Sequence, residues 1–381
     1  MRWKCWIVLL LFFILPLALA QLRPGFYSTS CRRAESIIFN AVLRRFSTDK
    51  TISAALLRMH FHDCFVTGCD ASILIDSTEQ NPSEKEAGPN LTVRGYELID
   101  EIKRALEVEC PSTVSCADIV TIATRDGVVL AGGPNYTIPT GRRDGLRSFV
   151  GDVDLPGPDL TIPEAFQPFR AKGLTLNDMV TLLGAHTVGI AHCSFFQDRL
   201  SGFQGTAAAD PKMNRTLVTK LRSSCDAANS NNPDPTAFLD QNTNNLFDNK
   251  FYSEILSHRG VLQIDQELAL DQSTVPLVSK FASNPIEFRQ MFGNAMIKLG
   301  NLQVLVGNAG QIRKNCRAFN PVRPQQPIKP KPIGQGQQPK PKPKPKQGQK
   351  PKPKPKKQKP IKRGKKDKPI NGGRKQNPKK F

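Results

Sequence analysis

Arg58-Met-His-Phe-His62-Asp-Cys64 is the stretch of this sequence that says most about its fold. It belongs to a segment of helical periodicity in which Arg58, Phe61 and His62 are three or four residues apart. Side chains at these spacings project from one side of a helix. The segment therefore predicts a cation, an aromatic ring and an imidazole that can transfer protons, all next to one another.

A second histidine lies far downstream, in Gly184-Ala-His186-Thr-Val-Gly189. It follows an apolar stripe within residues 179–183, and Thr175 and Asp178 indicate a capping box at the start of that helix. A buried imidazole in this setting suits an axial iron ligand. The two histidine segments together describe the two faces of a haem.

Other uses of these histidines have less support. A single histidine on an apolar helix face, such as His186, is usually a core residue. His60 and His62 could form a zinc or copper pair, but residues two apart on a helix diverge. Neither His-Glu-x-x-His nor paired Cys-x-x-Cys completes such a site. Cys-x-x-Cys-His is also absent, so we expect any haem to be held non-covalently.

The sequence resembles the secreted plant-type haem peroxidases, also called class III, from about Gln21 to Asn320. Six motifs follow the order of that family. They are Arg58-Met-His-Phe-His-Asp-Cys-Phe-Val-x-Gly-Cys-Asp-Ala-Ser72, Ser115-Cys-Ala-Asp-Ile, Gly141-Arg-Arg-Asp, Leu155-Pro-x-Pro158, Gly184-Ala-His-Thr-Val-Gly189 and Phe247-Asp-Asn-Lys. The resemblance implies a mainly helical fold of two interlocked halves with haem b between them.

Helical periodicity dominates residues 21–320, which are numerous enough to bury a core. Strand-like alternation is sparse, so the pattern itself also predicts an all-α unit. The clearest predicted helices are Glu35 to Arg45, Ser53 to Asp63, Arg94 to Glu109, Ala117 to Leu130, Thr175 to Gly184 and Pro285 to Leu299.

Residues 1–20 have the pattern of a secretory signal peptide. A basic start precedes an apolar run from Trp6 to Leu17, and small residues follow at Ala18 and Ala20. The run is too short to favour a membrane span. We expect the mature chain to begin at Gln21, to be exported and soluble, and to contain no tryptophan.

Cysteine usage agrees with export. Cys5 belongs to the signal peptide, and the eight remaining cysteines indicate four disulfides in an exported chain. Spacing alone leaves 105 connectivities open. The family resemblance implies one of them, namely Cys31–Cys110, Cys64–Cys69, Cys116–Cys316 and Cys193–Cys225.

The sequence changes character at Pro321. Residues 321–381 hold 22 of the chain's 54 lysines and arginines, one acid (Asp367) and 15 of its 31 prolines. Residues 1–320 therefore have 32 basic and 32 acidic side chains, and the net charge of +21 belongs to the tail. Repeats such as Pro339-Lys-Pro-Lys-Pro-Lys-Pro-Lys346 favour neither helix nor sheet and offer nothing apolar to bury. We expect a disordered, extended polycation.

Peroxide cleavage needs a base that moves a proton from one peroxide oxygen to the other, and a cation that stabilises the separating charge. His62 and Arg58 match these roles. The resemblance implies that Asn90, oriented by Glu84, accepts a hydrogen bond from the second ring nitrogen of His62. It also implies that Phe61 shields the iron.

On the opposite face, the resemblance implies that His186 binds the haem iron and that Asp265 accepts a hydrogen bond from its far ring nitrogen. Such a carboxylate increases electron density at the iron and favours O–O cleavage. Without His186, Asp265 would be interpreted as a loop acid that caps a helix. Asp118 and Arg142 are expected to form a buried structural ion pair with no catalytic role.

Two oxygen-rich stretches match the family's calcium loops, although an Asp-rich loop by itself is most often a turn. Asp63 and Thr187 directly follow the two haem histidines, which would couple calcium binding to the pocket. The implied distal ligands are Asp63, Val66, Gly68, Asp70 and Ser72. The implied proximal ligands are Thr187, Asp240, Thr243, Leu246 through its carbonyl, and Asp248.

Pro156 matches the proline whose carbonyl faces aromatic donors in the family, and Phe195 could form a second wall. Gly88 and Asp159 occupy positions that are bulky aromatics in some members, so we expect an open donor site. Three Asn-x-Thr sequons occur, at Asn90, Asn135 and Asn214. Because Asn90 is assigned to His62, the other two are the expected glycan sites.

The sequence therefore predicts a secreted, monomeric haem peroxidase with two calcium ions that reduces hydrogen peroxide and oxidises phenolic donors in one-electron steps. We expect it in the cell wall or apoplast, with the tail bound to acidic polysaccharide such as de-esterified pectin. If the tail is a sorting segment that is removed on maturation, the vacuole is an alternative location. The simplest alternative for the tail is a solvated spacer that binds nothing.

Two other functions have less support from the sequence. A wall-anchoring or structural protein with an inactive haem domain is disfavoured because Arg58, His62, Asn90, His186 and Asp265 are all intact. Nucleic-acid binding through the tail, where Lys362-Arg-Gly-Lys-Lys366 resembles a nuclear signal, is disfavoured by export. We therefore expect no specific nucleic-acid partner and no membrane partner.

Overall fold

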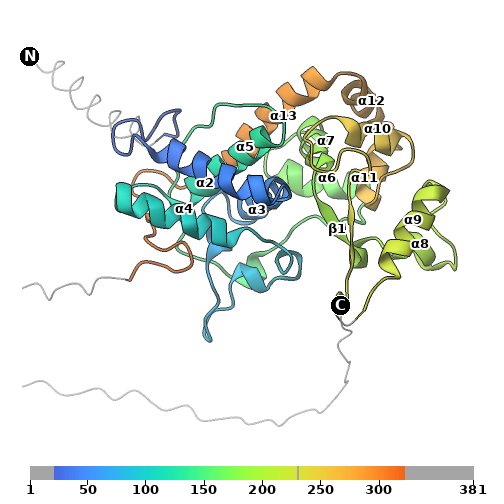
Figure 1. The fold of residues 1–381 in the computed structure, drawn as a ribbon, viewed down its shortest axis with the longest axis horizontal. Coiled ribbons are helices and arrows are strands. Elements are labelled where there is room, and N and C mark those ends of the chain that lie inside the picture. The colour runs from blue at the N-terminus through green and yellow to red at the C-terminus, as the bar shows by residue number, and fades with distance from the viewer. Residues whose placement is uncertain (1–20, 230, 322–381) are drawn as a thin grey trace, which may run out of the picture. The chain divides into compact units, whose positions relative to one another are not determined.

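The computed structural model describes residues 21–229 and 231–321. The predicted signal peptide, with Trp3 and Trp6, and the predicted tail beyond Pro321 lie outside the described residues. Within the described part the chain is mainly α-helical, as the sequence predicts (Figure 1). None of its helices is long and apolar enough to cross a bilayer.

The N-terminal half contains four long helices, and each one matches a predicted segment to within a few residues. The largest shift at a helix start is that of α4, which begins at Tyr96 because Gly95 has a φ of 102° and cannot continue a right-handed helix. The four helices are α2 (Ala34–Thr48), α3 (Ile52–Val66), α4 (Tyr96–Glu109) and α5 (Cys116–Leu130).

The C-terminal half contains shorter helices and the two described strands, β1 (Ile190–His192) and β2 (Thr236–Phe238), which pair antiparallel. Its helices are α6 (Ile162–Ala171), α7 (Leu176–Leu183), α8 (Asp198–Ser201), α9 (Arg215–Cys225), α10 (Lys250–Leu256), α11 (Gln263–Leu268), α12 (Val275–Ser283) and α13 (Pro285–Gly300). Short 3-10 turns connect them, including η2 (Glu84–Glu86), η3 (Gly88–Asn90), η5 (Gly184–Thr187) and η6 (Cys193–Phe195).

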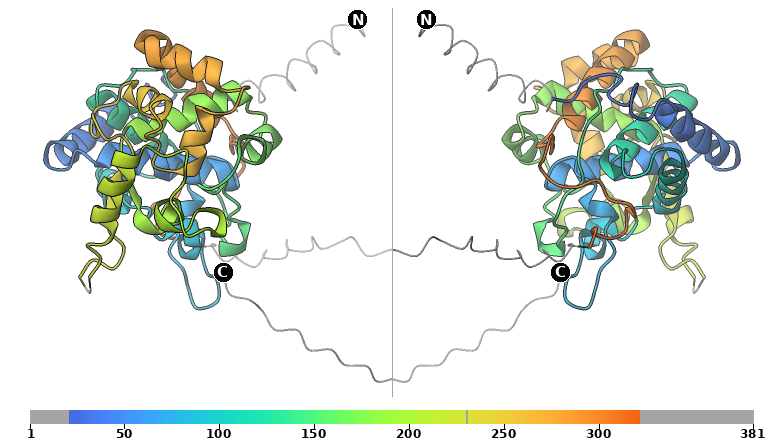
Figure 2. Two further views of the ribbon diagram at one scale, coloured as in Figure 1. Left: turned by 90° about the vertical axis from the view of Figure 1, so that its right-hand side faces the viewer. Right: turned by 90° about the vertical axis from the view of Figure 1, so that its left-hand side faces the viewer.

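The two halves interlock through α13 and the segment that follows it. α13 packs against both α7 and α3. The chain then returns to the N-terminal half, where the Leu302 carbonyl accepts a hydrogen bond from the amide of Cys69 and Arg317 pairs with Asp100 of α4 at 2.8 Å. Figure 2 shows this orange segment running from α13 along the domain.

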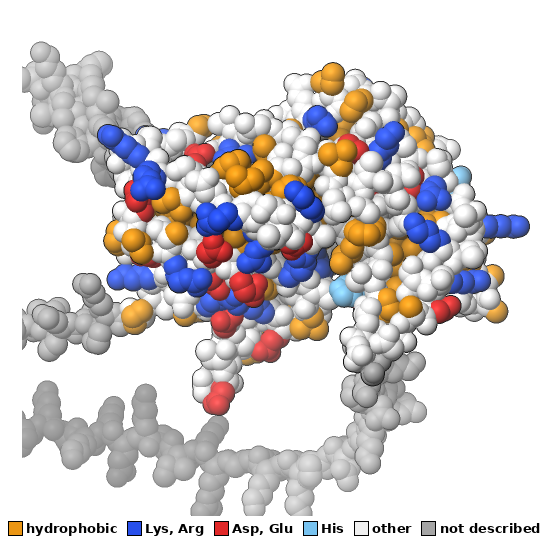
Figure 3. Space-filling view, in the orientation of Figure 1, with side chains coloured by type: hydrophobic (Ala, Val, Ile, Leu, Met, Phe, Trp, Pro, Cys, Tyr) orange, Lys and Arg blue, Asp and Glu red, His pale blue; other side chains and the backbone are white. Residues whose placement is uncertain are grey.

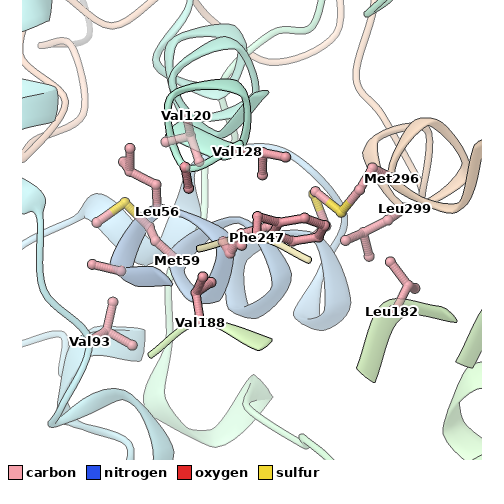
Figure 4. Packing of buried hydrophobic residues seen from close by; sticks show 14 of the residues in the cluster. Leu56, Met59, Val93, Val120, Val128, Leu182, Val188, Phe247, Met296 and Leu299 are labelled. Carbon is pink, nitrogen blue, oxygen red and sulfur yellow. The ribbon is translucent and has the colours of Figure 1, made fainter. Parts of the chain in front are cut away.

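α3 is the central helix of the domain. Apolar side chains surround it on nearly all sides, which is typical of a helix inside a core rather than on a surface. Leu56 and Met59 of α3 belong to the same buried cluster as Val120 of α5 and Leu299 of α13, and Figure 4 shows these residues from the three helices. The helix that presents Arg58 and His62 is therefore held from several directions.

Four disulfides are present, and they are the same four pairs that the family resemblance implies. Cys64–Cys69 closes the loop after α3, and Cys193–Cys225 ties the end of β1 to α9. Cys31–Cys110 and Cys116–Cys316 complete the set, and the latter spans 200 residues. Cross-links of this kind stabilise by about 2–4 kcal/mol each, mainly by constraining the unfolded chain.

Asp118 and Arg142 form the expected buried ion pair at 2.8 Å, with side-chain exposures of 0% and 1%. Asp118 also accepts hydrogen bonds from the hydroxyl of Tyr27 and the amide of Gly141, and Arg142 donates to the carbonyl of Gly300 at the end of α13. The pair thus connects α5 to the last helix. Its partners are all main-chain or structural groups, so it has no catalytic contact.

We predict that Asp118→Ala lowers the free energy of unfolding by about 3–5 kcal/mol, because it leaves the Arg142 guanidinium buried without its counter-ion. Urea unfolding followed by circular dichroism measures the loss. The exposed pair between Arg33 and Glu109 provides the control, since Glu109→Ala should cost less than about 1 kcal/mol. Equal effects of the two substitutions would contradict a structural role for the buried pair.

Candidate active site

A cavity of about 340 Å³ brings the two histidine segments together. Arg58, Phe61 and His62 line it from α3, and His186 lines it from η5. Most of its remaining wall is apolar, with side chains such as Leu57, Ala165, Phe169, Leu182, Val188 and Met296. The cavity is therefore a hydrophobic slot with polar groups concentrated at two places on its wall.

Arg58 is fixed by three hydrogen bonds. Its Nη1 donates to the hydroxyl of Thr92 and its Nη2 to the carbonyl of Pro89, both at 2.8 Å, and its Nε donates to Nε2 of His62 at 3.3 Å. The guanidinium remains close to His62 because the loop before α4 holds its other end. Thr92 and Pro89 are site residues that the sequence analysis did not identify, since only the tertiary fold places them beside α3.

His62 has a defined tautomer. Its Nδ1 lies 2.6 Å from Oδ1 of Asn90, and Nδ2 of Asn90 donates to the main-chain carbonyl of Glu84 at 2.7 Å. The Glu84 carbonyl can only accept, so the amide group of Asn90 points its oxygen at the imidazole. Nδ1 of His62 must therefore carry the proton, and Nε2 is the basic nitrogen that faces the cavity.

Burial lowers the pKa of His62 to about 4, and the neighbouring Arg58 guanidinium lowers it further, against a smaller opposing contribution from Asn90. Because the folded-state pKa lies below the usual value of about 6.5, His62 is neutral throughout the neutral range. A neutral imidazole next to a fixed cation can accept a proton without first losing one.

His60 lies on a different side of α3 and does not join His62. Its Nδ1 is 3.5 Å from Sγ of Cys64, and burial lowers its pKa to about 3 with a smaller contribution from Arg142. The structure thus separates the two imidazoles, as expected for residues two apart on a helix. It gives no support to a zinc or copper pair.

His186 is placed by the end of α7. The predicted capping box is present, with Thr175 and Asp178 exchanging hydrogen bonds at the start of that helix. At its end, a Cβ on Gly184 would lie 2.3 Å from the hydroxyl of Tyr252, so only glycine permits this approach. η5 then turns His186 into the cavity.

Asp265 holds His186 from behind. Oδ1 of Asp265, a residue 1% exposed on α11, lies 2.7 Å from Nδ1 of His186. Nδ1 donates to the carboxylate, which leaves Nε2 of His186 as a bare nitrogen suited to a metal ion. The same short helix, α11, is also bonded to the rim of the cavity, where the amide of Ile264 donates to the carbonyl of Pro158 at 2.9 Å.

The mouth of the cavity is marked by lining residues that are partly exposed to solvent. Pro156 is half-buried there, and Phe195 is 37% exposed. His192 of β1 lies on the same rim, with Nδ1 3.1 Å from the carbonyl of Asp234. His192 could not be predicted as a site residue, because nothing in its local sequence distinguishes it from a surface histidine.

The loop after α3 gathers buried acidic groups. Asp63 accepts from the amide of Ala71 through Oδ2, while its buried Oδ1 has no hydrogen-bond partner among the described residues. Burial raises the pKa of Asp63, and the nearby carboxylates of Asp70 and Glu84 raise it further. A cation among these oxygens would relieve both effects.

Three further details concern this loop. Gly68 has a φ of 105°, and a Cβ there would lie 2.6 Å from the carbonyl of Gln303, so the turn requires glycine. The carbonyl of Val66 accepts a hydrogen bond from Nζ of Lys172 at 3.2 Å. Ser72 is fully buried, with its hydroxyl 3.3 Å from that of Thr67.

The second oxygen-rich loop surrounds Thr187. Its hydroxyl lies 3.4 Å from Oδ2 of Asp240 and 3.2 Å from Oδ1 of Asp248, and the hydroxyl of Thr243 lies at the same two distances. Burial raises the pKa of Asp240, with a contribution from Asp248. Leu246 lies in the same loop, where its amide donates to the Thr243 carbonyl.

Within residues 21–229 and 231–321, no three His, Cys, Asp or Glu side chains are grouped as a metal site. The two loops each contribute two carboxylates, and hydroxyl and carbonyl oxygens would have to supply the rest. Calcium accepts such mixed oxygen ligands, whereas zinc sites are built mainly from nitrogen and sulfur ligands.

The three sequons differ in accessibility. Asn90 is 2% exposed and committed to His62, whereas Asn135 is exposed. Asn214 caps α9 through its Oδ1 and is half-buried. Asn135 is thus the most accessible of the three.

Comparison with known proteins gives a consistent result. A family model described as peroxidase matches residues 38–284. Peroxidase 44 of Arabidopsis thaliana is 57% identical over 309 residues, which cover 81% of this chain and 96% of that protein. Peroxidase 57 of Arabidopsis thaliana is 56% identical over 82% of this chain and 97% of its own length. Peroxidase 5 of Vitis vinifera is 44% identical over 79% of this chain and 92% of its own length.

Proposed function

The chain belongs to the secreted plant-type (class III) haem peroxidases, and we propose that Arg58, His62 and His186 are the residues through which it reduces hydrogen peroxide. The family reduces hydrogen peroxide and oxidises phenolic donors in one-electron steps, and this chain is such an enzyme. The observation that supports the residue assignment best is the pair of imidazoles that line one cavity, each with Nδ1 bonded to a fixed acceptor and Nε2 facing the cavity.

The residues present fit a non-covalent haem b. The cavity wall is largely apolar, which suits a flat hydrophobic ring system, and no cysteine is free to attach it, since the eight in the described residues form disulfides. Nε2 of His186 would bind the iron, and Asp265 would keep that nitrogen basic. Bound haem supplies the electrons that break the O–O bond and later withdraws electrons from donors.

On the distal side, Nε2 of His62 accepts a proton from one peroxide oxygen. The same nitrogen then returns it to the other oxygen, which leaves as water. The Arg58 guanidinium, 3.3 Å away, stabilises the negative charge that develops as the oxygens separate. Asn90 keeps His62 in the one tautomer that can do this. Phenolic donors would approach at the rim beside Pro156, away from this pair.

We also propose two calcium sites, distal at Asp63, Val66, Gly68, Asp70 and Ser72, and proximal at Thr187, Asp240, Thr243, Leu246 and Asp248. The buried, unpartnered oxygen of Asp63 and the raised pKa values of Asp63, Asp70 and Asp240 support them. Lys172 already occupies one lone pair of the Val66 carbonyl, which leaves the other available for the ion.

We further propose that the basic tail retains the enzyme on acidic wall polysaccharide outside the cell, and that the enzyme is a monomer. The support is compositional, since residues 1–320 have no net charge while residues 321–381 have +21. Figure 3 shows lysines and arginines interspersed with acidic side chains on one face of the domain. Proline spacing keeps lysines apart for multivalent contact with a polyanion.

We predict that His62→Ala slows peroxide consumption by roughly 100- to 10,000-fold, the usual contribution of a general acid–base, while haem remains bound. Arg58→Leu should be less severe, because the base remains. Single-turnover peroxide consumption and the Soret absorbance measure the two properties. His258→Asn, at an exposed histidine with a φ of 60° that asparagine tolerates, is the control. Near-normal rates in His62→Ala would reject the assignment.

Removal of calcium should lower both activity and thermal stability, since an ion that binds only the folded state stabilises it by mass action. Treatment with EDTA, followed by metal analysis, melting temperature and the haem spectrum, tests this. Readdition of calcium should restore all three in the wild type but not in Asp63→Asn. If complete metal removal changes none of them, the two loops are turns without an ion.

For the tail, we compare the full-length enzyme with a form that ends at Asn320, on immobilised polygalacturonate. Only the full-length enzyme should bind at low salt, and it should elute as the Debye length falls from about 10 Å at 0.1 M to about 3 Å at 1 M. Guaiacol turnover should be the same for both. Equal retention of the two forms would place the binding surface on the globular domain.

A further inference from the structure

The two-stranded sheet beside the cavity has one buried face and one exposed face. Ala191 and Ala237, opposite each other in the pairing, are buried. Side chains alternate along a strand, so Ile190, His192, Thr236 and Phe238 point to the other side. Ile190 is 40% exposed and Phe238 is 38% exposed. Figure 3 shows hydrophobic side chains at the surface in the region where Figure 1 labels β1.

The strand register sorts this exposed face into an apolar half and a polar half. Ile190 is directly opposite Phe238, and His192 is directly opposite Thr236. Directly opposed side chains have their Cβ atoms about 4.5–5.5 Å apart and form a continuous surface. We call the four residues Ile190, His192, Thr236 and Phe238 the strand platform.

The strand platform continues the rim of the cavity. Ile190 and His192 line the cavity as well as the platform, and Phe195, exposed to 37%, follows immediately in η6. Phe238 and Thr236 do not line the cavity. The platform therefore extends the apolar wall outward, from the place where a phenol enters to a surface beyond it.

The platform is rigidly connected to the proximal side of the site. β1 starts three residues after Thr187, and β2 ends two residues before Asp240. The amide of Leu239 donates to the carbonyl of Gly189 at 3.1 Å, and Cys193–Cys225 closes the other end. A surface fixed in this way can bind a ligand without first becoming ordered, which lowers the entropic cost of binding.

We propose that the strand platform binds the second aromatic ring of a two-ring phenol whose first ring occupies the cavity mouth. The proposal rests on the proposed function, and it specifies the class of donor: linked phenols are preferred to single-ring phenols. The second ring packs on Ile190 and Phe238. Aromatic pairs of this kind contribute beyond the area they bury.

The polar half of the platform matches the substituents of such a ring. Both the carbonyl of Asp234, at 3.1 Å, and its carboxylate, at 3.5 Å, lie near Nδ1 of His192 and can only accept, so Nδ1 carries a proton and Nε2 is left to hydrogen-bond with a phenolic hydroxyl. The hydroxyl of Thr236 lies opposite. The enzyme's own reaction generates donors of this class, because two phenoxyl radicals couple through one new C–C or C–O bond to give a two-ring phenol that can be oxidised again.

The test compares guaiacol with its biphenyl-linked dimer as donors for the haem-loaded enzyme. In Phe238→Ala the ratio of kcat/KM for the dimer to that for guaiacol should fall about tenfold, the size expected for loss of one aromatic contact. The dissociation constant of the dimer, measured without peroxide from the change in haem absorbance, should rise by the same factor. Phe238→Tyr, which keeps the ring, should restore both values.

Phe39→Ala is the matched control, because Phe39 is 36% exposed on α2 and does not line the cavity. An unchanged ratio in Phe238→Ala, with the dimer bound as in the wild type, overturns the inference. If the wild-type enzyme oxidises neither donor, the proposed function itself is rejected. If Phe238→Ala weakens self-association or polygalacturonate retention and leaves dimer binding intact, the platform serves another occupant and the inference is wrong.

Discussion

The site depends on one kind of interaction, a short hydrogen bond from Nδ1 of a histidine that lines the cavity to a fixed acceptor. His62 makes it with Asn90 at 2.6 Å, and His186 makes it with Asp265 at 2.7 Å. Each bond determines the tautomer, and each directs an unprotonated Nε2 into the same cavity. One nitrogen is then available for a proton and the other for iron. The two acceptors differ because an amide leaves the distal imidazole weakly basic, whereas a carboxylate increases the electron density of the proximal one.

The rest of the fold keeps these acceptors in place. Asn90 is held by the Glu84 carbonyl in the segment that precedes α4, and Asp265 is on a short helix anchored to the rim at Pro158. Neither acceptor is on the helix that contains its histidine. The interlocked halves, closed by Cys116–Cys316 and by Arg142 against Gly300, therefore matter to the chemistry as well as to stability.

The proposed donor and ion sites lie on main-chain segments next to the two histidines. The residue after His62 is a buried aspartate, and the residue after His186 is a buried threonine that faces two carboxylates. The strand platform begins only three residues beyond that threonine. The proposed ion, haem and donor sites thus share main-chain segments on the proximal side. The small sheet therefore lies next to the residues proposed for catalysis, although the rest of the domain is mainly helical.

The sequence alone determined the helical class, the long helices, the two histidine segments and the separation of a neutral domain from a basic tail. These follow from short-range physics: periodicity over a few turns, the capping box at Thr175, and composition. Family resemblance added Asn90, Asp265 and the disulfide pairs, which no local pattern indicates. The resemblance also implied that Glu84 orients Asn90. Only the tertiary structure decided that the main-chain carbonyl of Glu84 does so, that Thr92 and Pro89 hold Arg58, and that His192 and Phe238 share a face at the rim. Such contacts join residues far apart in the chain, and their geometry follows from how the halves pack rather than from any single segment.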